Sequence, residues 1–406
     1  MEEWKEYKLG DVASVQTGPF GSQLHNKDYV KAGTPIVTVE HLGARLFSTQ
    51  NLPCVSDVDK VRLGKYTLEE GDIVFSRVGS VDRCSYVSAK EVGWLFSGRC
   101  LRVRCNDTIQ PMFLYYYLQK EEVKQSIRNI AVGATMPSIN TKLLSEIQII
   151  APSKTSQKLI ATTLSSLDDK IECNRRINDN LLQQARALYK SWFVDFEPFK
   201  GGKFEDSELG MIPYGWSVKQ LGKITTQVNE KVKERVDVKV LSPITTGELV
   251  LSEEYFTKQV FSESISKYIV VKPFDFAYNP ARVNIGSLGM NTFIFDGCVS
   301  PVYVVFRCED NYQYFFDLFR QTDYFKEEVK TRAIGGVRQT LGYKDFSLIK
   351  VVYPPKDIVE KFNKIYSTLL SKKTKNDVEN ARLGEIRDIL LPKLMSGELK
   401  VSEMNV

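Results

Sequence analysis

The sequence predicts an α+β protein: two similar mixed α/β domains joined by two long antiparallel helices that form a coiled coil, with a pseudo-two-fold internal repeat. Three observations lead to this fold class. The chain repeats itself at a shift of roughly 202 to 212 residues. Each copy opens with short apolar runs separated by Gly, Pro and Asp, and each copy closes with a heptad pattern of apolar residues.

The internal repeat consists of matches that occur in the same order in both copies. Three tracts return: Trp4–Gly10 as Trp216–Gly222, Glu70–Phe75 as Pro273–Tyr278, and Ser97–Arg104 as Ser300–Arg307. A constant shift then aligns Gly133 with Gly335, Lys142 with Lys344, Ser145 with Ser347, Ile147 with Ile349, Pro152 with Pro354, Lys154 with Lys356, Leu167 with Leu369 and Lys170 with Lys372. Chance does not supply so long a collinear series, so the chain contains a duplicated unit.

Each copy is expected to hold a domain followed by a helix. The predicted boundaries are a first domain at 1–152, a long helix at 153–197, a linker loop at 198–212, a second domain at 213–354 and a second long helix at 355–400. Within the domains, three apolar runs rich in β-branched and aromatic residues predict strands, namely Ile36–Val39, Asp72–Phe75 and Val302–Phe306. Two aromatic runs followed by helix-favouring residues predict helices, Phe113–Leu118 and Tyr314–Phe319.

The long helices carry a seam whose steps alternate between four and three residues. In the first helix the seam residues are Ile160, Leu164, Leu167, Ile171, Asn174, Asn178, Leu181, Ala185, Leu188 and Trp192. In the second helix they are Phe362, Tyr366, Leu369, Lys373, Asn376, Asn380, Leu383, Arg387, Leu390 and Leu394. A polar residue in such a seam costs stability and fixes register and partner, so the repeated Asn pairs predict that the helices pack on each other. The alternative is that each helix packs separately on its own domain.

We expect the second helix to end at Pro392 and Gly397, because proline interrupts a helix and glycine favours its C-terminal cap. Two similar globules carried by helices suggest a caliper. The first helix would span roughly 50 Å at 1.5 Å rise per residue. Successive turns of a DNA duplex present equivalent groove faces about 34 Å apart. Since the two globules differ in sequence, they would read different half-sites.

The composition excludes several classes of protein. A net charge of +5 permits a polyanionic partner without demanding one. Seven cysteines with no CxxC pair, and only two histidines, predict reduced thiols and no metal site. No apolar run is long enough for a membrane span, and the first residues are polar and acidic, so we expect a cytoplasmic protein.

The motifs of an enzyme are missing. An amino-methyltransferase needs an Asn/Asp-Pro-Pro-aromatic tetrad and a Gly-rich cofactor loop, and the nearest tetrad here, Tyr278–Ala281, has one proline and no following aromatic residue. There is no phosphate-binding loop, because Gly64-Lys65 and Gly202-Lys203 lack the required spacing and the Ser or Thr. The sequence therefore predicts no catalytic residue and no cofactor in this chain.

Four tracts resemble the specificity subunits of type I restriction–modification enzymes. They are Tyr7–Ala13, Ser191–Pro198, Leu209–Trp216 and Asp388–Leu399, and the resemblance covers the whole chain. It implies that each domain is a target recognition domain reading one half of a bipartite DNA site. It also implies that the helices space the half-sites and bind two methyltransferase (M) subunits, in which S-adenosylmethionine is the cofactor. Restriction (R) subunits can join such complexes.

Glycine-containing loops with residues able to read base edges are the candidate DNA contacts. The candidates in the first domain are Phe20, Ser22, Gln23, Arg77, Ser80, Arg83 and Thr135, the last in a turn expected just before the long helix. Those in the second domain are Arg282, Asn284, Ser287, Arg338 and Gln339. For each residue the alternative is an ordinary polar surface loop. Two other functions stay open: a coiled-coil adaptor that binds only proteins, and a fused enzyme with its own methyltransferase.

Overall fold

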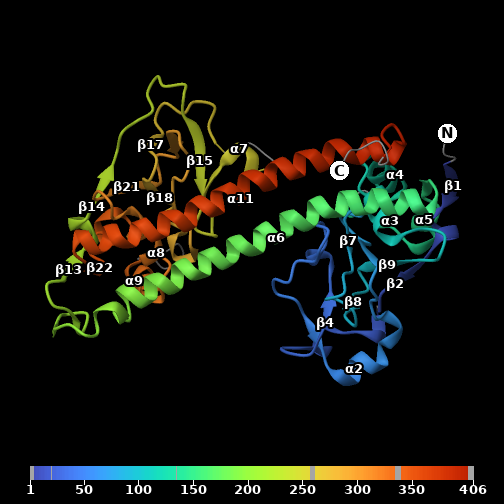
Figure 1. Ribbon diagram of the computed structural model, residues 1–406, viewed down its shortest axis with the longest axis horizontal. Helices are drawn as coiled ribbons and strands as arrows, with labels where there is room; N and C mark the ends of the chain where they lie inside the picture. The colour runs from blue at the N-terminus through green and yellow to red at the C-terminus, as the bar shows by residue number, and fades with distance from the viewer. Residues whose placement is uncertain (1–3, 20, 134, 257–260, 334–339, 401–406) are drawn as a thin grey trace. The chain divides into compact units, whose positions relative to one another are not determined.

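The computed structural model describes residues 4–19, 21–133, 135–256, 261–333 and 340–400 (Figure 1). The chain divides into two compact units. Unit 1 contains Met1–Asn174 and Asp377–Val406, and unit 2 contains Arg175–Asn376. The boundary between the units therefore falls inside each long helix, whereas the sequence placed its domain boundaries at the helix ends.

Unit 1 has three small sheets. The strands are β1 (Lys5–Lys8), β2 (Ala13–Thr17), β3 (Tyr29–Val30), β4 (Thr34–Val37), β5 (Cys54–Val55), β6 (Ile73–Ser76), β7 (Cys84–Tyr86), β8 (Leu95–Phe96), β9 (Cys100–Cys105) and β10 (Gln148–Ala151). One sheet pairs β1 with β10, a second has the order β2-β9-β6-β7, and the third has the order β3-β5-β4-β8. All these pairings are antiparallel except that of β4 with β8.

The core of unit 1 forms where helices cover the β2-β9-β6-β7 sheet. The short helices are α1 (Leu9–Val12), α2 (Asp57–Arg62), α3 (Pro111–Leu118), α4 (Glu121–Ile130) and α5 (Thr141–Ser145). Residues 113–118 of α3 are all buried, as the aromatic run predicted. They share one hydrophobic cluster with Phe75 and Leu101 of the sheet and with Leu164 and Leu394 of the long helices. The long helices are thus part of this core.

Unit 2 repeats the architecture. Its strands are β13 (Ser217–Gln220), β14 (Thr225–Val228), β15 (Lys239–Pro243), β16 (Leu249–Leu251), β17 (Ile269–Val271), β18 (Phe276–Tyr278), β19 (Leu288–Met290), β20 (Gly297–Val299), β21 (Val304–Cys308) and β22 (Lys350–Tyr353). The sheets are β13-β22, β14-β21-β18-β19 and β16-β15-β20-β17. The last sheet gains its fourth strand at opposite edges in the two units: β3 lies beside β5 in unit 1, whereas β17 lies beside β20, the counterpart of β8, in unit 2.

The helices of unit 2 keep the spacing of the sequence repeat. They are α7 (Ser252–Tyr255), α8 (Gln313–Phe319), α9 (Asp323–Arg332) and α10 (Tyr343–Phe346). The last three begin 202 residues after α3, α4 and α5. Also within unit 2, β11 (Phe204–Glu205) and β12 (Ile212–Pro213) form a small antiparallel pair where a linker loop was expected.

Two repeated motifs have the same physical basis in both units. Asp72 accepts two hydrogen bonds from Arg104, from Nε and Nη2, both at 2.7 Å. Asp275 accepts the equivalent pair from Arg307 at 2.6 and 2.8 Å. The Leu-Gly sequence that recurs in both copies is explained by close packing of its glycine. A Cβ on Gly10 would lie 3.1 Å from Ser145 Cβ, and a Cβ on Gly222 would lie 2.8 Å from Ser347 Cβ.

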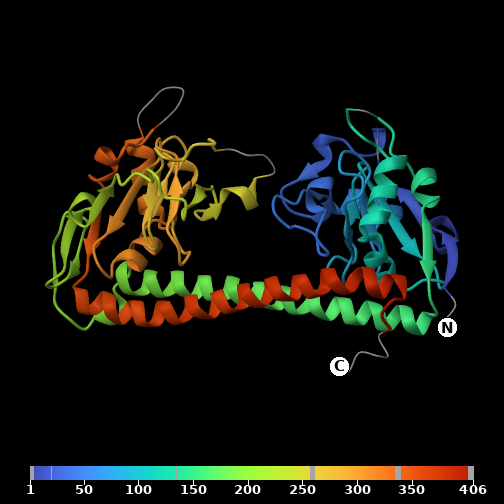
Figure 2. The same cartoon turned by 90° about the horizontal axis from the view of Figure 1, so that it is seen from above.

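The long helices α6 (Lys154–Phe193) and α11 (Lys356–Ser396) pack side by side within each unit (Figure 2). In unit 1, Asp168 pairs with Arg387 at 2.7 Å and Lys170 with Glu379 at 3.5 Å. In unit 2, the rings of Phe193 and Phe362 are 5.0 Å apart. Residues later in α6 meet residues earlier in α11, so the packing is antiparallel. The predicted mutual pairing is confirmed, and the alternative of separate packing is excluded.

Of the two expected ends of the second helix, Gly397 is confirmed and Pro392 is wrong. Helix α11 continues through Pro392 to Ser396, and Gly397 follows with φ of +75°. Proline lacks an N–H donor and its ring crowds the preceding turn. The helix nevertheless continues, because Leu394 and Met395 in the next turn are buried in the core of unit 1. None of the helices within the described residues is long and apolar enough to cross a membrane.

Candidate nucleic-acid interface

In unit 1, strand register places three loops at one end of the β2-β9-β6-β7 sheet. Thr17, the last residue of β2, pairs with Leu101, and Ser76, the last residue of β6, pairs with Cys100. The segments 18–23, 77–83 and 97–99 therefore all leave the same sheet end. Two of these segments are predicted DNA-contacting loops, and the third was not singled out by the sequence.

Backbone contacts hold these three loops together. Gly18 donates its N–H to Cys100 O at 3.2 Å, and Arg77 donates its N–H to Arg99 O at 2.8 Å. The Arg77 guanidinium also donates to Gly98 O at 3.3 Å. A Cβ on Gly18 would lie 2.2 Å from Ser97 O, so only glycine allows this approach.

The predicted turn around Thr135 joins the same group. Pro137 O accepts a hydrogen bond from Gly79 N at 2.8 Å, and Arg77 O accepts one from Ile139 N at 3.0 Å. Thr135 is exposed in this turn. The turn does not directly precede the long helix as expected, because α5 and β10 lie between them. The structure thus brings three predicted segments of unit 1 into one surface region.

The predicted side chains in these segments have different environments. Ser80 is exposed and Arg77 is half-buried. Arg83 donates a hydrogen bond to Leu42 O, and Gln23 accepts one from Tyr66 OH at 2.5 Å. These two side chains therefore take part in contacts within unit 1. Two other predicted sites, Phe20 and the side chain of Ser22, lie outside what the structure describes.

Unit 2 presents the equivalent sheet end. Val228, the last residue of β14, pairs with Val305, and Tyr278, the last residue of β18, pairs with Val304. The loop after β18 holds Arg282, which is exposed. Leu341 N donates to Pro280 O at 3.1 Å, which repeats the bond between Ile139 and Arg77 in unit 1.

The other predicted DNA-contacting residues of unit 2 differ in how far their side chains are buried. Asn284 is half-buried in a short 3-10 helix, Val283–Ile285. Ser287 is 1% exposed, and its hydroxyl donates to Pro243 O at 2.8 Å, so the structure turns this side chain into the protein. Arg338 and Gln339 lie outside the described residues.

One exposed cation at the sheet end of unit 1 was missed by the sequence analysis. Arg99 lies in the loop before β9, beside Arg77. Its counterpart in unit 2 is Val302, which is 71% exposed. The signal was available in the repeat, since aligning Ser97–Arg104 with Ser300–Arg307 pairs these two positions. The same surface thus differs in chemistry between the units.

The acidic residue of the 77–83 loop, Asp82, forms an ion pair outside that loop. Asp82 accepts a hydrogen bond from Arg128 of α4 at 2.5 Å, and its side chain is 18% exposed. Its charge therefore offsets that of Arg128 rather than that of the loop arginines.

The predicted seam residues line the contact between α6 and α11 within each unit. Those that are buried are Ile160, Leu164, Ile171, Asn174, Asn178, Leu181, Ala185, Phe362, Tyr366 and Leu394. Those that are half-buried are Leu167, Leu188, Trp192, Leu369, Lys373, Asn376, Asn380, Leu383, Arg387 and Leu390. Two further buried residues of α6, Tyr189 and Phe193, are 4% and 5% exposed and were not predicted from the seam pattern. The apolar stripe of α6 widens there because that segment packs on both α11 and α8, where the ring of Phe315 meets those of Tyr189 and Phe193.

The charged residue at seam position 387 also has a structural role. Arg387 donates to Asp168 at 2.7 Å, and Asp168 accepts a second hydrogen bond from Tyr116 OH at 2.6 Å. Burial, with the neighbouring carboxylate of Asp168 adding to it, raises the pKa of Tyr116 well above its ordinary value. The tyrosine therefore stays protonated and fixes α3 to both long helices.

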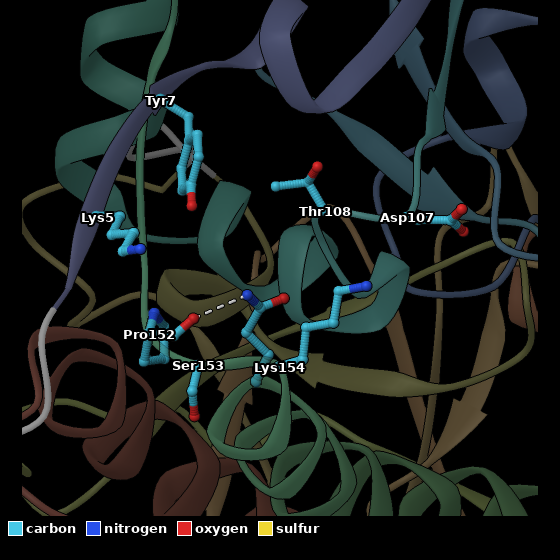
Figure 3. Close-up of a pocket in the computed structure, with 8 residues that line it drawn as sticks. Lys5, Tyr7, Asp107, Thr108, Pro152, Ser153 and Lys154 are labelled. Atoms are coloured by element: carbon cyan, nitrogen blue, oxygen red, sulfur yellow. Dashed lines mark hydrogen bonds between the residues drawn. The ribbon is translucent and has the colours of Figure 1, made fainter.

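Two cavities occupy equivalent places at the start of the long helices. The one in unit 1 has a volume of about 600 Å³ and is lined by Lys5, Tyr7 and Lys154 among others (Figure 3). The one in unit 2 has a volume of about 430 Å³ and is lined by Lys219 and Lys356 among others. None of the predicted DNA-contacting residues lines either cavity. Within the described residues there is no group of three or more His, Cys, Asp or Glu side chains that could hold a metal ion.

The known proteins whose sequences resemble this chain are type I restriction enzyme specificity subunits. Residues 1–183 match the family described as the type I restriction modification DNA specificity domain. The type I restriction enzyme MjaIX specificity subunit of Methanocaldococcus jannaschii is 28% identical over 309 residues, which cover 73% of this chain and 71% of that protein. The HindI specificity subunit of Haemophilus influenzae is 24% identical over 483 residues, which cover 98% of this chain and all of that protein.

Solved structures show the same likeness in fold. The crystal structure of the type I restriction–modification S subunit from M. genitalium aligns with a TM-score of 0.60 at 17% sequence identity. The alignment covers 97% of this chain and 96% of that one. The likeness thus extends over both units.

Proposed function

We propose that this chain is a member of the type I restriction–modification specificity-subunit family, which it resembles in sequence and fold, and that its two units act as that family's two recognition domains. It is the non-catalytic subunit that gives such a system its DNA sequence specificity. Unit 1 and unit 2 are its target recognition domains, and each reads one half of a bipartite, gapped site.

The observation that carries this proposal is that both units present the same loops at the same sheet end with different side chains. Unit 1 offers Arg77, Arg99 and Thr135, whereas unit 2 offers Arg282 and Val302 at comparable places. Arginine pairs with guanine edges or phosphates, and threonine and apolar groups contact other base edges. A common scaffold with different contact residues supports two half-sites of different sequence.

The two long helices are proposed to set the distance between the half-sites and to bind two M subunits. Helix α6 has 40 residues and α11 has 41, so each extends about 60 Å at 1.5 Å per residue. S-adenosylmethionine is then bound by the M subunits, and R subunits join where the system cleaves DNA. Double-stranded DNA and the M subunits are the partners that this proposal requires.

We place the protein in the cytoplasm, with its DNA substrate. All seven cysteines are free thiols in the structure, which fits a reducing compartment.

Mapping of adenine methylation in the host genome tests the proposal. The methylome is compared with and without this gene, in cells where the M subunit is expressed in both. A gapped, asymmetric two-part motif that disappears on deletion is the expected result. An unchanged methylome, with the M subunit shown to be active, would contradict the proposal and favour a protein-only adaptor. Methylation by the purified chain without any partner would instead indicate a fused enzyme.

A further inference from the structure

We propose that Met136 of unit 1 contacts the C5 methyl group of a thymine in one DNA half-site. This inference rests on the proposed function, since it assigns one apolar contact within the surface by which unit 1 reads DNA. It adds an apolar contact to a region in which most of the predicted DNA-contacting residues are polar.

Met136 is an apolar side chain held out from the surface. It is 65% exposed, and Val132 at the base of the same turn is 64% exposed. Single exposed apolar residues are common on proteins and need no explanation by themselves. The position of Met136 is what matters, because its turn is bonded directly to the loop that carries Arg77.

The turn from Val132 to Ser138 is closed by its own hydrogen bonds. Val132 N donates to Ser138 O at 2.9 Å, and Ser138 N donates to Val132 O at 2.8 Å. Gly133 has φ of +112°, and a Cβ there would lie 2.8 Å from Met136 O. Glycine at this position therefore allows the turn to close tightly beneath Met136.

Other contacts attach the turn to the positive loops. Gly79 N donates to Pro137 O at 2.8 Å, and Ile139 N donates to Arg77 O at 3.0 Å. Arg77 N donates in turn to Arg99 O at 2.8 Å. The exposed cation Arg99 thus lies on a segment that is bonded, through Arg77, to the turn. Its charge favours a polyanion as the occupant of the surface around Met136.

The chemistry of the major groove identifies the group that an apolar side chain can contact there. The base edges present hydrogen-bond donors and acceptors, together with the C5 methyl group of thymine. Methionine is unbranched and polarizable, so its thioether can adapt to a methyl group. A contact with thymine would therefore let unit 1 distinguish a T·A pair by shape and apolarity.

Deoxyuridine tests this contact, because it differs from thymidine only by the missing methyl group. The wild-type chain is assembled with its M subunit, and binding to the bipartite site is measured by fluorescence anisotropy at one fixed salt concentration. Each thymidine of both half-sites is then replaced in turn by deoxyuridine. At one position, in one half-site only, we expect the dissociation constant to rise about 3- to 5-fold, as for the loss of one buried methyl group.

The variant Met136→Ala should abolish that difference. It should bind the thymidine site about as weakly as the wild type binds the deoxyuridine site, with no further loss on substitution. The matched control is Val92→Ala, also an exposed apolar residue of unit 1, at 51% exposure. Its loop is bonded through Gly93 N and Leu68 O (3.0 Å) to the segment before β6, away from the end that carries Arg77. The control should keep the full sensitivity to deoxyuridine.

Three results would overturn the inference. Wild-type binding could be insensitive to deoxyuridine at every position, or Met136→Ala could keep the sensitivity. Met136→Ala could also weaken binding equally at all thymidines and deoxyuridines, which indicates a general contact rather than a thymine contact. Failure of the proposed function is distinguishable, because the wild-type complex would then show no preference for a bipartite site before any base is replaced.

Discussion

Asn174 and Asn380 are hydrogen-bonded to each other in the seam between α6 and α11, with Asn174 Nδ2 donating to Asn380 Oδ1 at 3.0 Å. The internal repeat places the equivalent contact in unit 2, where Asn376 Nδ2 donates to Asn178 Oδ1 at 2.8 Å. Asn174 is 1% exposed and Asn178 is 6% exposed. Because a buried amide needs a partner, this pairing penalises any other register of the two helices.

The first prediction concerns the stability of this Asn pair. Asn174→Leu should lower the free energy of unfolding by about 1 kcal/mol, because Asn380 Oδ1 and the Glu379 carboxylate lose the hydrogen bonds that Asn174 Nδ2 donates. The double variant Asn174→Leu/Asn380→Leu should recover most of this loss, since an apolar pair suits the seam. Urea denaturation of the three chains measures the effect. Equal losses in the single and double variants would mean that the pair does not act as a unit.

The second prediction concerns the repeated Asp–Arg pair. Asp72 is 1% exposed, so Arg104→Met leaves a buried carboxylate without its main partner. We expect the free energy of unfolding to fall by about 3 to 5 kcal/mol. The control Lys8→Met removes an exposed ion pair with Glu146 and should change stability little. If both variants lost a comparable free energy of unfolding, burial would not be what makes the Asp72–Arg104 pair important for stability.

The third prediction separates the two reading surfaces. Arg99→Gln in unit 1 should weaken binding by about 1 to 3 kcal/mol if the arginine pairs with a base, and should relax the preference in one half-site only. Arg282→Gln should act on the other half-site. The methylation motif of each variant, mapped by long-read sequencing, shows which half-site degenerates. If both variants changed the same half-site, the assignment of one half-site to each unit would be wrong.

The fourth prediction concerns the spacing of the half-sites. A heptad inserted into both α6 and α11, after Arg176 and after Val378, keeps the seam in phase and lengthens each helix by about 10 Å. The gap in the methylated motif should then grow by about three base pairs, at about 3.4 Å each. The half-site sequences should stay the same, and a change in their identity would contradict the division into readers and spacer.

The fifth prediction concerns the thiols. Burial raises the pKa values of Cys84, Cys100, Cys105 and Cys298 to about 12, so these side chains stay protonated and unreactive through neutral pH. Cys173 is exposed on α6. Maleimide should therefore label Cys173 first at pH 7, as peptide mass spectrometry can show. Rapid labelling of a buried thiol in the native chain would contradict the described packing.

Several predictions from sequence hold because they depend on periodic patterns within one element. Helices α3 and α8 were expected from their aromatic runs, and the seam of α6 and α11 from its heptads. Burial repeats with the period of a helix, so the printed sequence carries that information directly. The sequence showed that Asp72 and Arg104 both recur in the second copy of the repeat, but it did not show that the two side chains pair. The predicted helix end at Pro392 was wrong, because the packing of Leu394 and Met395 outweighs the local tendency of proline to interrupt a helix.

The candidate contacts were harder to predict, because the direction of a loop side chain depends on residues far away in the chain. Arg83 donates to Leu42 O, and Ser287 donates to Pro243 O, so distant segments decide what these residues do. The adjacency of Met136, Arg77 and Arg99 likewise results from strand register and from hydrogen bonds between loops. The sequence alone determined the duplication, the helical seam and the family resemblance. Only the tertiary structure decided which polar side chains stay at the surface, because that choice depends on contacts that no local pattern records.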